Sequence, residues 1–308
     1  MAALLSYIYF FGVIIAALFG YINSPMALAL GFVFSVGFKH PFLKQSQKGL
    51  QWLLKLAVVG LGFGMVLQDT IQTSASSFGL ILCSVVLTVS FGLFISKSFH
   101  LNKHLGHLIT SGTSICGGSA IAAISPIIKA DSKTISMALV TVFLLNALAL
   151  FVFPVLGHWL HLNQHDFGLW CAVAIHDTSS VVGAALNYGE EALKIATTVK
   201  LSRTLWIIPM SVLSMFAFKT KGQHIKFPYF ILLFIGAILI NSFHIIPEIV
   251  TQQFVNVSKH LLVVSLFLIG TSISLPDLKQ AGWKPVVFAS ILWIFVSLTS
   301  LAYILYLQ

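Results

Sequence analysis

Two stretches of this chain set small polar residues inside long apolar runs. The first is segment 111–120, SGTSICGGSA, and the second is segment 176–185, HDTSSVVGAA. Glycine weakens a helix by about 1 kcal/mol per residue, and Ser and Thr hydroxyls compete for its backbone hydrogen bonds. Unwound backbone at membrane depth occurs only where protein buries it or where it lines a watery cavity. Two such interruptions predict a substrate site near the middle of a membrane.

Close helix packing is the competing explanation, because Gly, Ser and Ala are common where membrane helices touch. Packing accounts well for the glycines and alanines of both stretches. It accounts poorly for the adjacent pair His176 and Asp177, since such groups are costly inside a membrane. We therefore expect helical hydrogen bonding to lapse near 113–117 and near 176–179.

A helix that restarts after each interruption presents unpaired N–H groups and a partial positive charge, which suit an anion. The residues predicted to bind an anion there are Thr113, Ser114, Gly117, Gly118, Ser119, Asp177, Thr178 and Ser179. Asp177 is equally explained as a helix N-cap or as a group that binds a coupling proton or Na⁺. His176 fits proton coupling, and it fits equally a histidine that a helix-end carbonyl satisfies.

Arg203 is the only arginine of the chain, and Lys200 lies three residues before it on the same helical face. Either charge would cost at least about 2.5 kcal/mol if it faced lipid at the bilayer centre. A guanidinium fork matches an oxyanion through two parallel hydrogen bonds, which lysine cannot do. We expect both residues to bind the anion; snorkelling to an interface or pairing with Asp177 are the alternatives.

The remaining polar residues give no indication of a substrate site. Glu190 and Lys194 have the spacing of an exposed helix-end pair, and Asn146 is typical of the polar contacts between membrane helices. The sequence contains no HExxH, Walker or G-x-S-x-G motif, so we expect neither an enzyme nor a bound cofactor. The three cysteines have no metal-ligand spacing, and Cys116 lacks a neighbouring base that would make it a nucleophile.

The composition is that of an integral membrane protein. Of 308 residues, 58% are hydrophobic and only 8% are charged, with a mean hydropathy of +0.98, whereas about a quarter of a soluble protein is charged. No alternation of apolar and polar residues typical of a membrane β-barrel recurs. The net charge of +9 comes mostly from lysines in short loops, so it reports membrane topology rather than nucleic-acid binding.

The chain is expected to fold as one all-α domain, residues 1–308, in the form of a polytopic transmembrane bundle of about ten or eleven elements. The predicted elements are 4–21, 26–38, 50–67, 78–95, 104–128, 135–156, 167–186, 190–218, 228–241, 254–273 and 283–306. The lysines place the loop 39–48 in the cytoplasm and Gln308 in the periplasm, with Lys129 and Lys133 as exceptions. Segments 58–69 and 265–277 are similar and suggest an internal repeat.

Three motifs in fixed order resemble the YeiH-type family of inferred sulfate exporters. They are GTSICGGSAIAA at 112–123, AIHDTSSVVGA at 174–184 and ATTVKLSR at 196–203, and the resemblance extends from about Pro25 to the end of the chain. It implies a multi-pass protein of the bacterial inner membrane. It also implies a fold similar to that of secondary carriers with broken, crossing helices, such as bile-acid and sodium–proton transporters.

We expect a secondary carrier that moves a small anion across the bilayer with an ion gradient, and the resemblance suggests sulfate or a related oxyanion. An H⁺- or Na⁺-coupled carrier of an organic or amino-acid-like substrate is the alternative. An intramembrane enzyme or a membrane scaffold would be a different class. No nucleic-acid partner and no metal are expected, and homo-oligomerisation is left open.

Overall fold

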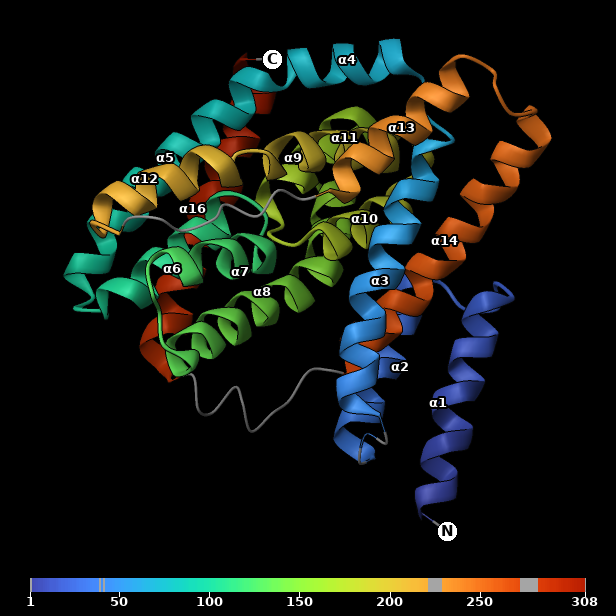
Figure 1. The fold of residues 1–308 in the computed structure, drawn as a ribbon, viewed down its shortest axis with the longest axis horizontal. Coiled ribbons are helices and arrows are strands. Elements are labelled where there is room, and N and C mark those ends of the chain that lie inside the picture. The colour runs from blue at the N-terminus through green and yellow to red at the C-terminus, as the bar shows by residue number, and fades with distance from the viewer. Residues whose placement is uncertain (1, 39, 41, 221–228, 272–281, 308) are drawn as a thin grey trace.

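The computed structural model describes residues 2–38, 40, 42–220, 229–271 and 282–307, and every regular element in these ranges is helical. Helices suit an apolar chain in lipid, because they satisfy their backbone polar groups internally. The helices are α1 Ala2–Leu18, α2 Ser24–Gly37, α3 Leu43–Gly62, α4 Leu67–Ser76, α5 Phe78–Ser98, α6 Lys103–Ser114, α7 Gly118–Ile127, α8 Ser132–Trp159, α9 Gln164–Ala174, α10 Thr178–Tyr188, α11 Glu190–Thr204, α12 Ile207–Ala217, α13 Phe230–Ser242, α14 Glu248–Thr271 and α16 Trp283–Leu307 (Figure 1).

Four of the described helices are long and apolar enough to cross a membrane, namely α5, α8, α14 and α16. The bent pair α3–α4, which turns by 109°, would make a fifth span. Shorter apolar helices include α1, α2, α7 and α13. The predicted polytopic helical bundle is confirmed.

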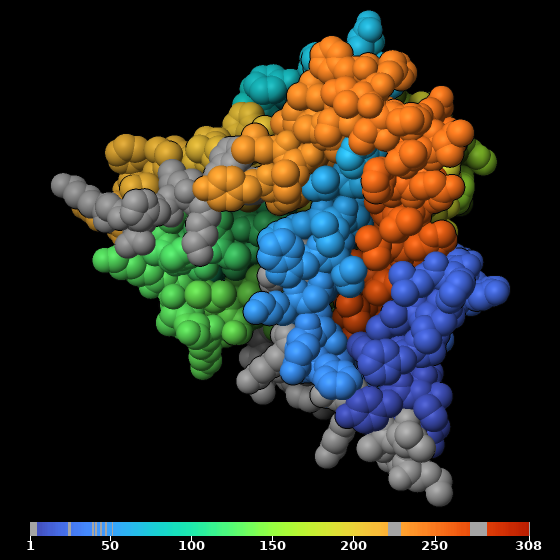
Figure 2. Space-filling view, turned by 45° about the vertical axis from the view of Figure 1, so that its right-hand side comes forward, coloured from blue at the N-terminus to red at the C-terminus, as the bar shows by residue number. Residues whose placement is uncertain are grey.

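The helices form two groups. In the first helix group, α14 packs against α1, α2 and α3, and α13 packs against α3; α1, α3, α13 and α14 lie next to one another in Figure 2. The second helix group comprises α5–α12 and α16. It meets the first where α10 contacts α2 and α14. The helix α4 lies between the two groups, since it contacts α13 of the first and α11 of the second. All residues that were predicted to bind a substrate belong to the second group.

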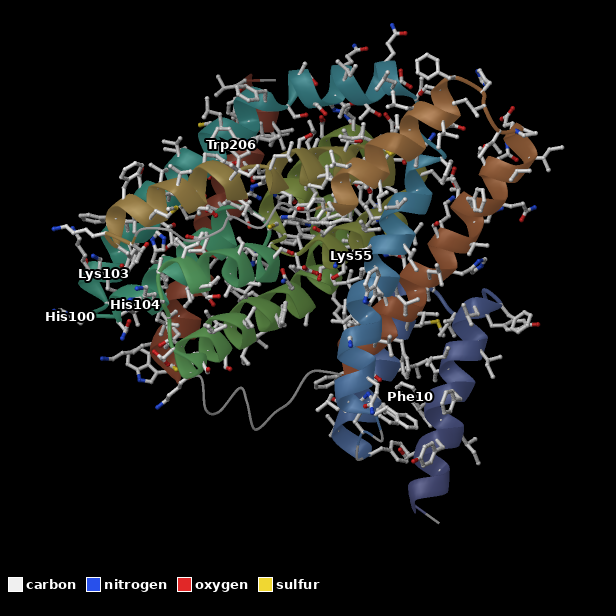
Figure 3. The ribbon with its side chains drawn as sticks, viewed as in Figure 1. Phe10, Lys55, His100, Lys103, His104 and Trp206 are labelled. Atoms are coloured by element: carbon white, nitrogen blue, oxygen red, sulfur yellow. The ribbon has the colours of Figure 1, made fainter. Side chains whose placement is uncertain are left out.

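Aromatic rings join the helices of the first group. The ring of Phe10 on α1 packs against Phe34 on α2 and Phe267 on α14, with centroids 5.6 and 5.5 Å away; Figure 3 labels Phe10 at this contact. It also lies 5.1 Å from the ring of His40. Aromatic contacts at these separations add to the energy of burial, so one side chain ties the N-terminal helix to two neighbours.

The structure corrects three sequence predictions. Segment 190–218 is not one helix, because α11 ends at Thr204 and α12 begins at Ile207. Pro209 has no N–H to donate to residue 205, so a continuous helix would lose a hydrogen bond there. Segment 67–76 forms the separate helix α4, which was not predicted. Segment 135–156 is longer than predicted, since α8 runs from Ser132 to Trp159 with Pro154 inside it.

Two further predictions extend outside the described residues. The similarity between 58–69 and 265–277 runs past Thr271, the last residue described before the gap at 272–281. The topology prediction depends partly on Lys39 and Gln308, which also lie outside the described ranges. The internal repeat and the orientation in the membrane stay predictions.

Gly270→Ala should destabilise the protein, because α2 and α14 touch through glycine backbone. A Cβ at Gly270 would lie 2.4 Å from the carbonyl oxygen of Leu28 and 2.9 Å from Cα of Gly31. These are backbone atoms with little freedom to yield, so we expect a loss of about 1–3 kcal/mol, seen as a lower Tm in detergent. Gly236→Ala in α13 is the matched control, since a Cβ there meets nothing within 4 Å. Equal Tm values for the two variants would contradict this close contact.

Candidate substrate site at two adjacent helix breaks

The first break, residues 115–117, separates α6 from α7. The chain turns at Gly117, which has φ 61° and ψ −122°, a conformation that L residues rarely adopt. Gly117 lies directly against the second interruption, because a Cβ there would be 3.3 Å from both C and Cβ of His176. Segments far apart in sequence therefore meet at their non-helical turns.

The second break, residues 175–177, separates α9 from α10 and is held by two side chains. Asp177 is the N-cap of α10, and its Oδ2 accepts a hydrogen bond from the backbone N–H of Ser179 at 3.1 Å and another from the Ser179 hydroxyl. Asn146 Oδ1 on α8 accepts from the N–H groups of His176 and Asp177, at 3.1 and 3.2 Å. Asn146 thus fixes the backbone at the turn.

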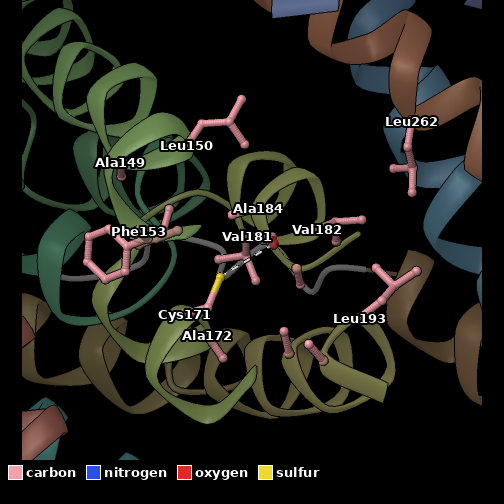
Figure 4. Packing of buried hydrophobic residues seen from close by; sticks show 14 of the residues in the cluster. Ala149, Leu150, Phe153, Cys171, Ala172, Val181, Val182, Ala184, Leu193 and Leu262 are labelled. Atoms are coloured by element: carbon pink, nitrogen blue, oxygen red, sulfur yellow. Dashed lines mark hydrogen bonds between the residues drawn. The ribbon is translucent and has the colours of Figure 1, made fainter. Parts of the chain in front are cut away.

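The two helices on either side of the second break pack closely. Cys171 on α9 donates through its sulfur to the carbonyl of Val181 on α10 at 3.5 Å, and Figure 4 shows this contact among buried apolar side chains. Cys116 and Cys171 are both 0% exposed. Both thiols are therefore shielded from solvent, and Cys171 contributes to the packing of α9 against α10.

Lys200 joins the two breaks through carbonyl oxygens. Its side chain is fully buried, and Nζ donates to Ile175 at 2.7 Å, to Ile115 at 3.2 Å and to Ala172 at 3.3 Å. Ile115 belongs to the first break and Ile175 to the second. An ammonium has three N–H groups, so these three bonds use its full donor capacity.

Arg203, one helical turn further along α11, contacts the ends of the same two helices. Its Nε donates to the carbonyl of Ser114 at 2.9 Å and its Nη2 to that of Thr113 at 3.3 Å, both at the end of α6. Its Nη1 donates to the carbonyls of Val173 and, at 3.5 Å, Ala172, near the end of α9. All three guanidinium nitrogens therefore face backbone oxygens.

These contacts revise the role expected for the two cations. The sequence predicted that Arg203 presents its fork to an anion, and the structure directs that fork at carbonyl groups. The last carbonyls of a helix have no partner within it and carry partial negative charge. Lys200 and Arg203 supply both donors and positive charge at the C-terminal ends of α6 and α9.

Several buried polar atoms at the breaks have no partner within the described part of the chain. Both ring nitrogens of His176, which is 0% exposed, make no hydrogen bond, and neither does Asn146 Nδ2. The hydroxyls of Ser111 and Thr113 on α6 are also unpaired. Buried polar groups are nearly always satisfied, so these atoms are open to ordered water or to a ligand.

The N-termini of α7 and α10 differ in their capping. Asp177 caps α10, whereas the N-cap residue of α7 is Gly117, which has no side chain to make such a bond. Ser119 in its first turn is exposed, and Asp177 and Thr178 are half-buried. A small solute therefore has polar surface to reach at these positions.

The structure brings only some of the predicted site residues together. Gly117, His176 and Asp177 lie together, whereas Gly118 faces the ring of Phe143 on α8. Ser114 donates its hydroxyl to Ser111 O, and Ser179 donates to Asp177. Glu190 pairs with Lys259 on α14 rather than with Lys194.

The residue whose place at the site was not predicted is Asn146, which the sequence indicated only as a polar contact between helices. Its signal was present, since it is a lone amide in the apolar run of α8. The sequence does not show that its partner is the turn at His176, 30 residues away.

Gly117→Ala should combine backbone strain with crowding against His176. A residue held in such a conformation costs about 1–3 kcal/mol, and the added Cβ would press on His176 and Val142 at 3.3 Å. We expect a lower Tm and weaker anion binding. Gly282→Ala separates the two causes, because Gly282 has φ 78° but open space around it. If both variants lost the same stability and kept the same binding, contact between the breaks would play no part.

Comparison with known proteins shows the relatives of this chain. The family model described as "Conserved hypothetical protein 698" matches residues 3–289. A UPF0324 membrane protein of Photobacterium profundum is 48% identical over 297 residues, covering 96% of this chain and 91% of the relative. Another, from Bacteroides thetaiotaomicron, is 46% identical over 289 residues, covering 92% and 87%. No solved structure matches.

Proposed function

This chain belongs to the UPF0324 family of bacterial multi-pass membrane proteins, and on that premise we propose that it is a secondary carrier for a small anion. The family membership confirms the resemblance seen in the sequence. The carrier role and the substrate are inferred from the adjacent breaks between α6 and α7 and between α9 and α10.

An excess of positive charge at the breaks is the observation that carries the proposal. Lys200 and Arg203 are fully buried, and among the residues that the structure describes Asp177 is the carboxylate whose charge acts on Lys200. The two helix C-termini and two helix N-termini that meet here have partial charges of opposite sign, which offset each other. Two cations and one carboxylate leave one positive charge in excess, and an uncompensated buried charge is costly. A bound anion removes that cost.

The N-terminus of α7 is the place where the anion is best stabilised. Lys200 and Arg203 donate their hydrogen bonds to carbonyl groups. They therefore attract the anion through their positive charge and do not contact it directly. The uncapped first turn of α7 offers N–H groups, which bind anions at helix N-termini. His176 and Asn146 add unpaired polar atoms beside it. Gly117, Gly118 and Ser119 thus bind the anion, while Lys200 and Arg203 hold the two helices and supply charge.

Transport driven by an ion gradient fits the remaining features. Asp177 is half-buried at the start of α10 and is the acidic group nearest the second break along the chain, so it is the residue proposed to take up a coupling H⁺ or Na⁺. A carrier is favoured over an enzyme because the one nucleophile in the first break, Cys116, is fully buried.

Flux measurements in proteoliposomes test the proposal. Purified protein should exchange radiolabelled oxyanion across the bilayer, and an unlabelled small anion should compete, while an amino acid should not. Empty liposomes and the Gly117→Ala protein serve as controls. Exchange of amino acids without exchange of any inorganic anion would reject the anion carrier and favour the alternative substrate class.

A further inference from the structure

The polar groups at the breaks allow the substrate class to be narrowed. We infer that the anion is singly charged and carries a hydroxyl, so that it donates one hydrogen bond to His176 while its other oxygens accept from Asn146 and α7. This inference rests on the proposed function, since it concerns the same site. It predicts that a doubly charged anion such as sulfate is the poorer ligand.

The charge balance at the breaks limits the charge that the anion can carry. Lys200 and Arg203 are buried, and within the described ranges Asp177 is the carboxylate that acts on Lys200, which leaves one positive charge in excess among these groups. A singly charged anion neutralises this excess. A doubly charged anion would leave a net negative charge next to the fully buried side chains of Lys200, Arg203 and His176, and an uncompensated charge among buried groups is costly.

The chemistry of His176 requires a hydrogen-bond donor on the ligand. The ammonium of Lys200 binds the carbonyl of Ile175, the residue next to His176, at 2.7 Å, and a fully buried imidazole beside a cation takes its neutral form. A neutral imidazole has one N–H donor and one acceptor nitrogen. Neither ring nitrogen has a partner among the described residues. A ligand that satisfies both must itself donate a hydrogen bond.

Asn146 supplies the complementary donors. Its Oδ1 is occupied by the N–H groups of His176 and Asp177, which fixes the orientation of the amide, and its Nδ2 is unpaired. An oxyanion with one hydroxyl has oxygens to accept from Nδ2 and from the first turn of α7. It also has the proton that the imidazole acceptor needs. Nitrate, perchlorate and halides lack that proton.

Matched pairs of anions test the inference on the purified full-length protein in detergent, with affinity measured by calorimetry. The planar pair is hydrogencarbonate and nitrate, and the tetrahedral pair is dihydrogenphosphate and perchlorate, the latter in mildly acidic buffer. Within a pair, charge and geometry match and the number of hydroxyls differs, since hydrogencarbonate carries one, dihydrogenphosphate two, and nitrate and perchlorate none. In the pair that binds more tightly, we expect the hydroxyl-bearing anion to bind about tenfold to a hundredfold better. We also expect sulfate to bind more weakly than that anion.

A substitution at His176 tests the assigned acceptor. His176→Phe keeps a flat ring and removes both nitrogens. The ratio of the affinities of the two anions in a pair should therefore fall towards one. His165→Phe, in the first turn of α9 where the side chain is 45% exposed, should retain the preference. A preference unchanged in His176→Phe would overturn the role of the imidazole. Should that variant fail to fold, the comparison of anions on the parent protein decides alone.

The outcomes separate this inference from the function on which it rests. If the hydroxyl-free anion binds as well as its partner, or if sulfate binds most tightly, the protein still binds anions and only the narrower class is wrong. If none of these anions binds, the anion carrier itself is overturned.

Discussion

In the Lys200→Met protein we expect thermal stability and anion binding to fall together. Methionine leaves the carbonyls of Ile115, Ala172 and Ile175 without the donor that they share. Removing one member of a buried charged network typically costs about 3–5 kcal/mol. The substitution also removes the positive charge that an anion is proposed to balance, so the remaining affinity should be small.

Lys194→Met is the matched control for this effect. Lys194 lies on the same helix, α11, but its side chain is exposed, so the same chemical change there should cost less than about 0.5 kcal/mol. Melting curves in detergent, with and without added anion, measure both effects. A Lys200→Met protein as stable as Lys194→Met would show that the carbonyl contacts do not hold the two breaks.

Arg203→Lys should be nearly as harmful as Arg203→Ala, although it keeps the positive charge. The guanidinium spans two helix ends, contacting Ser114 and Thr113 on α6 and Val173 on α9. A lysine at this position offers one nitrogen in place of three, so it cannot keep all of these contacts to both helices. Each charge-assisted hydrogen bond lost is worth about 1.5–3 kcal/mol, which lowers Tm by several degrees or more.

The dependence on anion distinguishes this role from direct substrate contact. If Arg203 joins α6 to α9, the loss of stability in Arg203→Lys is present without any anion. If instead Arg203 gripped the substrate, the variant would match the parent in anion-free buffer and differ only when anion is added. The second pattern would support direct binding of the anion by Arg203, which is the role that the sequence alone had suggested.

Much of the fold could be predicted from the sequence because its signals are local. Runs of apolar residues marked most helices to within a few positions, and the breaks lie inside segments whose Gly, Ser and His-Asp composition disfavours a helix. The α4 helix escaped detection because its sequence, LQDTIQTSAS, is too polar and too short for a span. The division between α11 and α12 required attention to Pro209 rather than to hydropathy.

The site was harder to predict, because a donor in the sequence does not reveal its acceptor. The fork of Arg203 fits a pair of carbonyl oxygens as readily as an oxyanion, and those oxygens belong to residues as far as 90 positions away in the chain. Asn146 was attributed to helix contacts for the same reason, since its partners lie 30 and 31 residues away. Only the tertiary arrangement shows that three distant segments meet at one place.

Anomalous diffraction from crystals of the protein soaked in selenite tests the central claim most directly. Near neutral pH this anion is mainly hydrogenselenite, which carries a single charge, one hydroxyl and a selenium atom whose anomalous signal identifies it. We predict an anomalous peak at the N-terminus of α7, within hydrogen-bond distance of the backbone N–H groups of Gly118 and Ser119 and next to His176. The peak should be absent from isomorphous crystals of Gly117→Ala. Anomalous peaks confined to surface lysines, with none between Gly117 and His176, would contradict the assignment of an anion site to the two breaks.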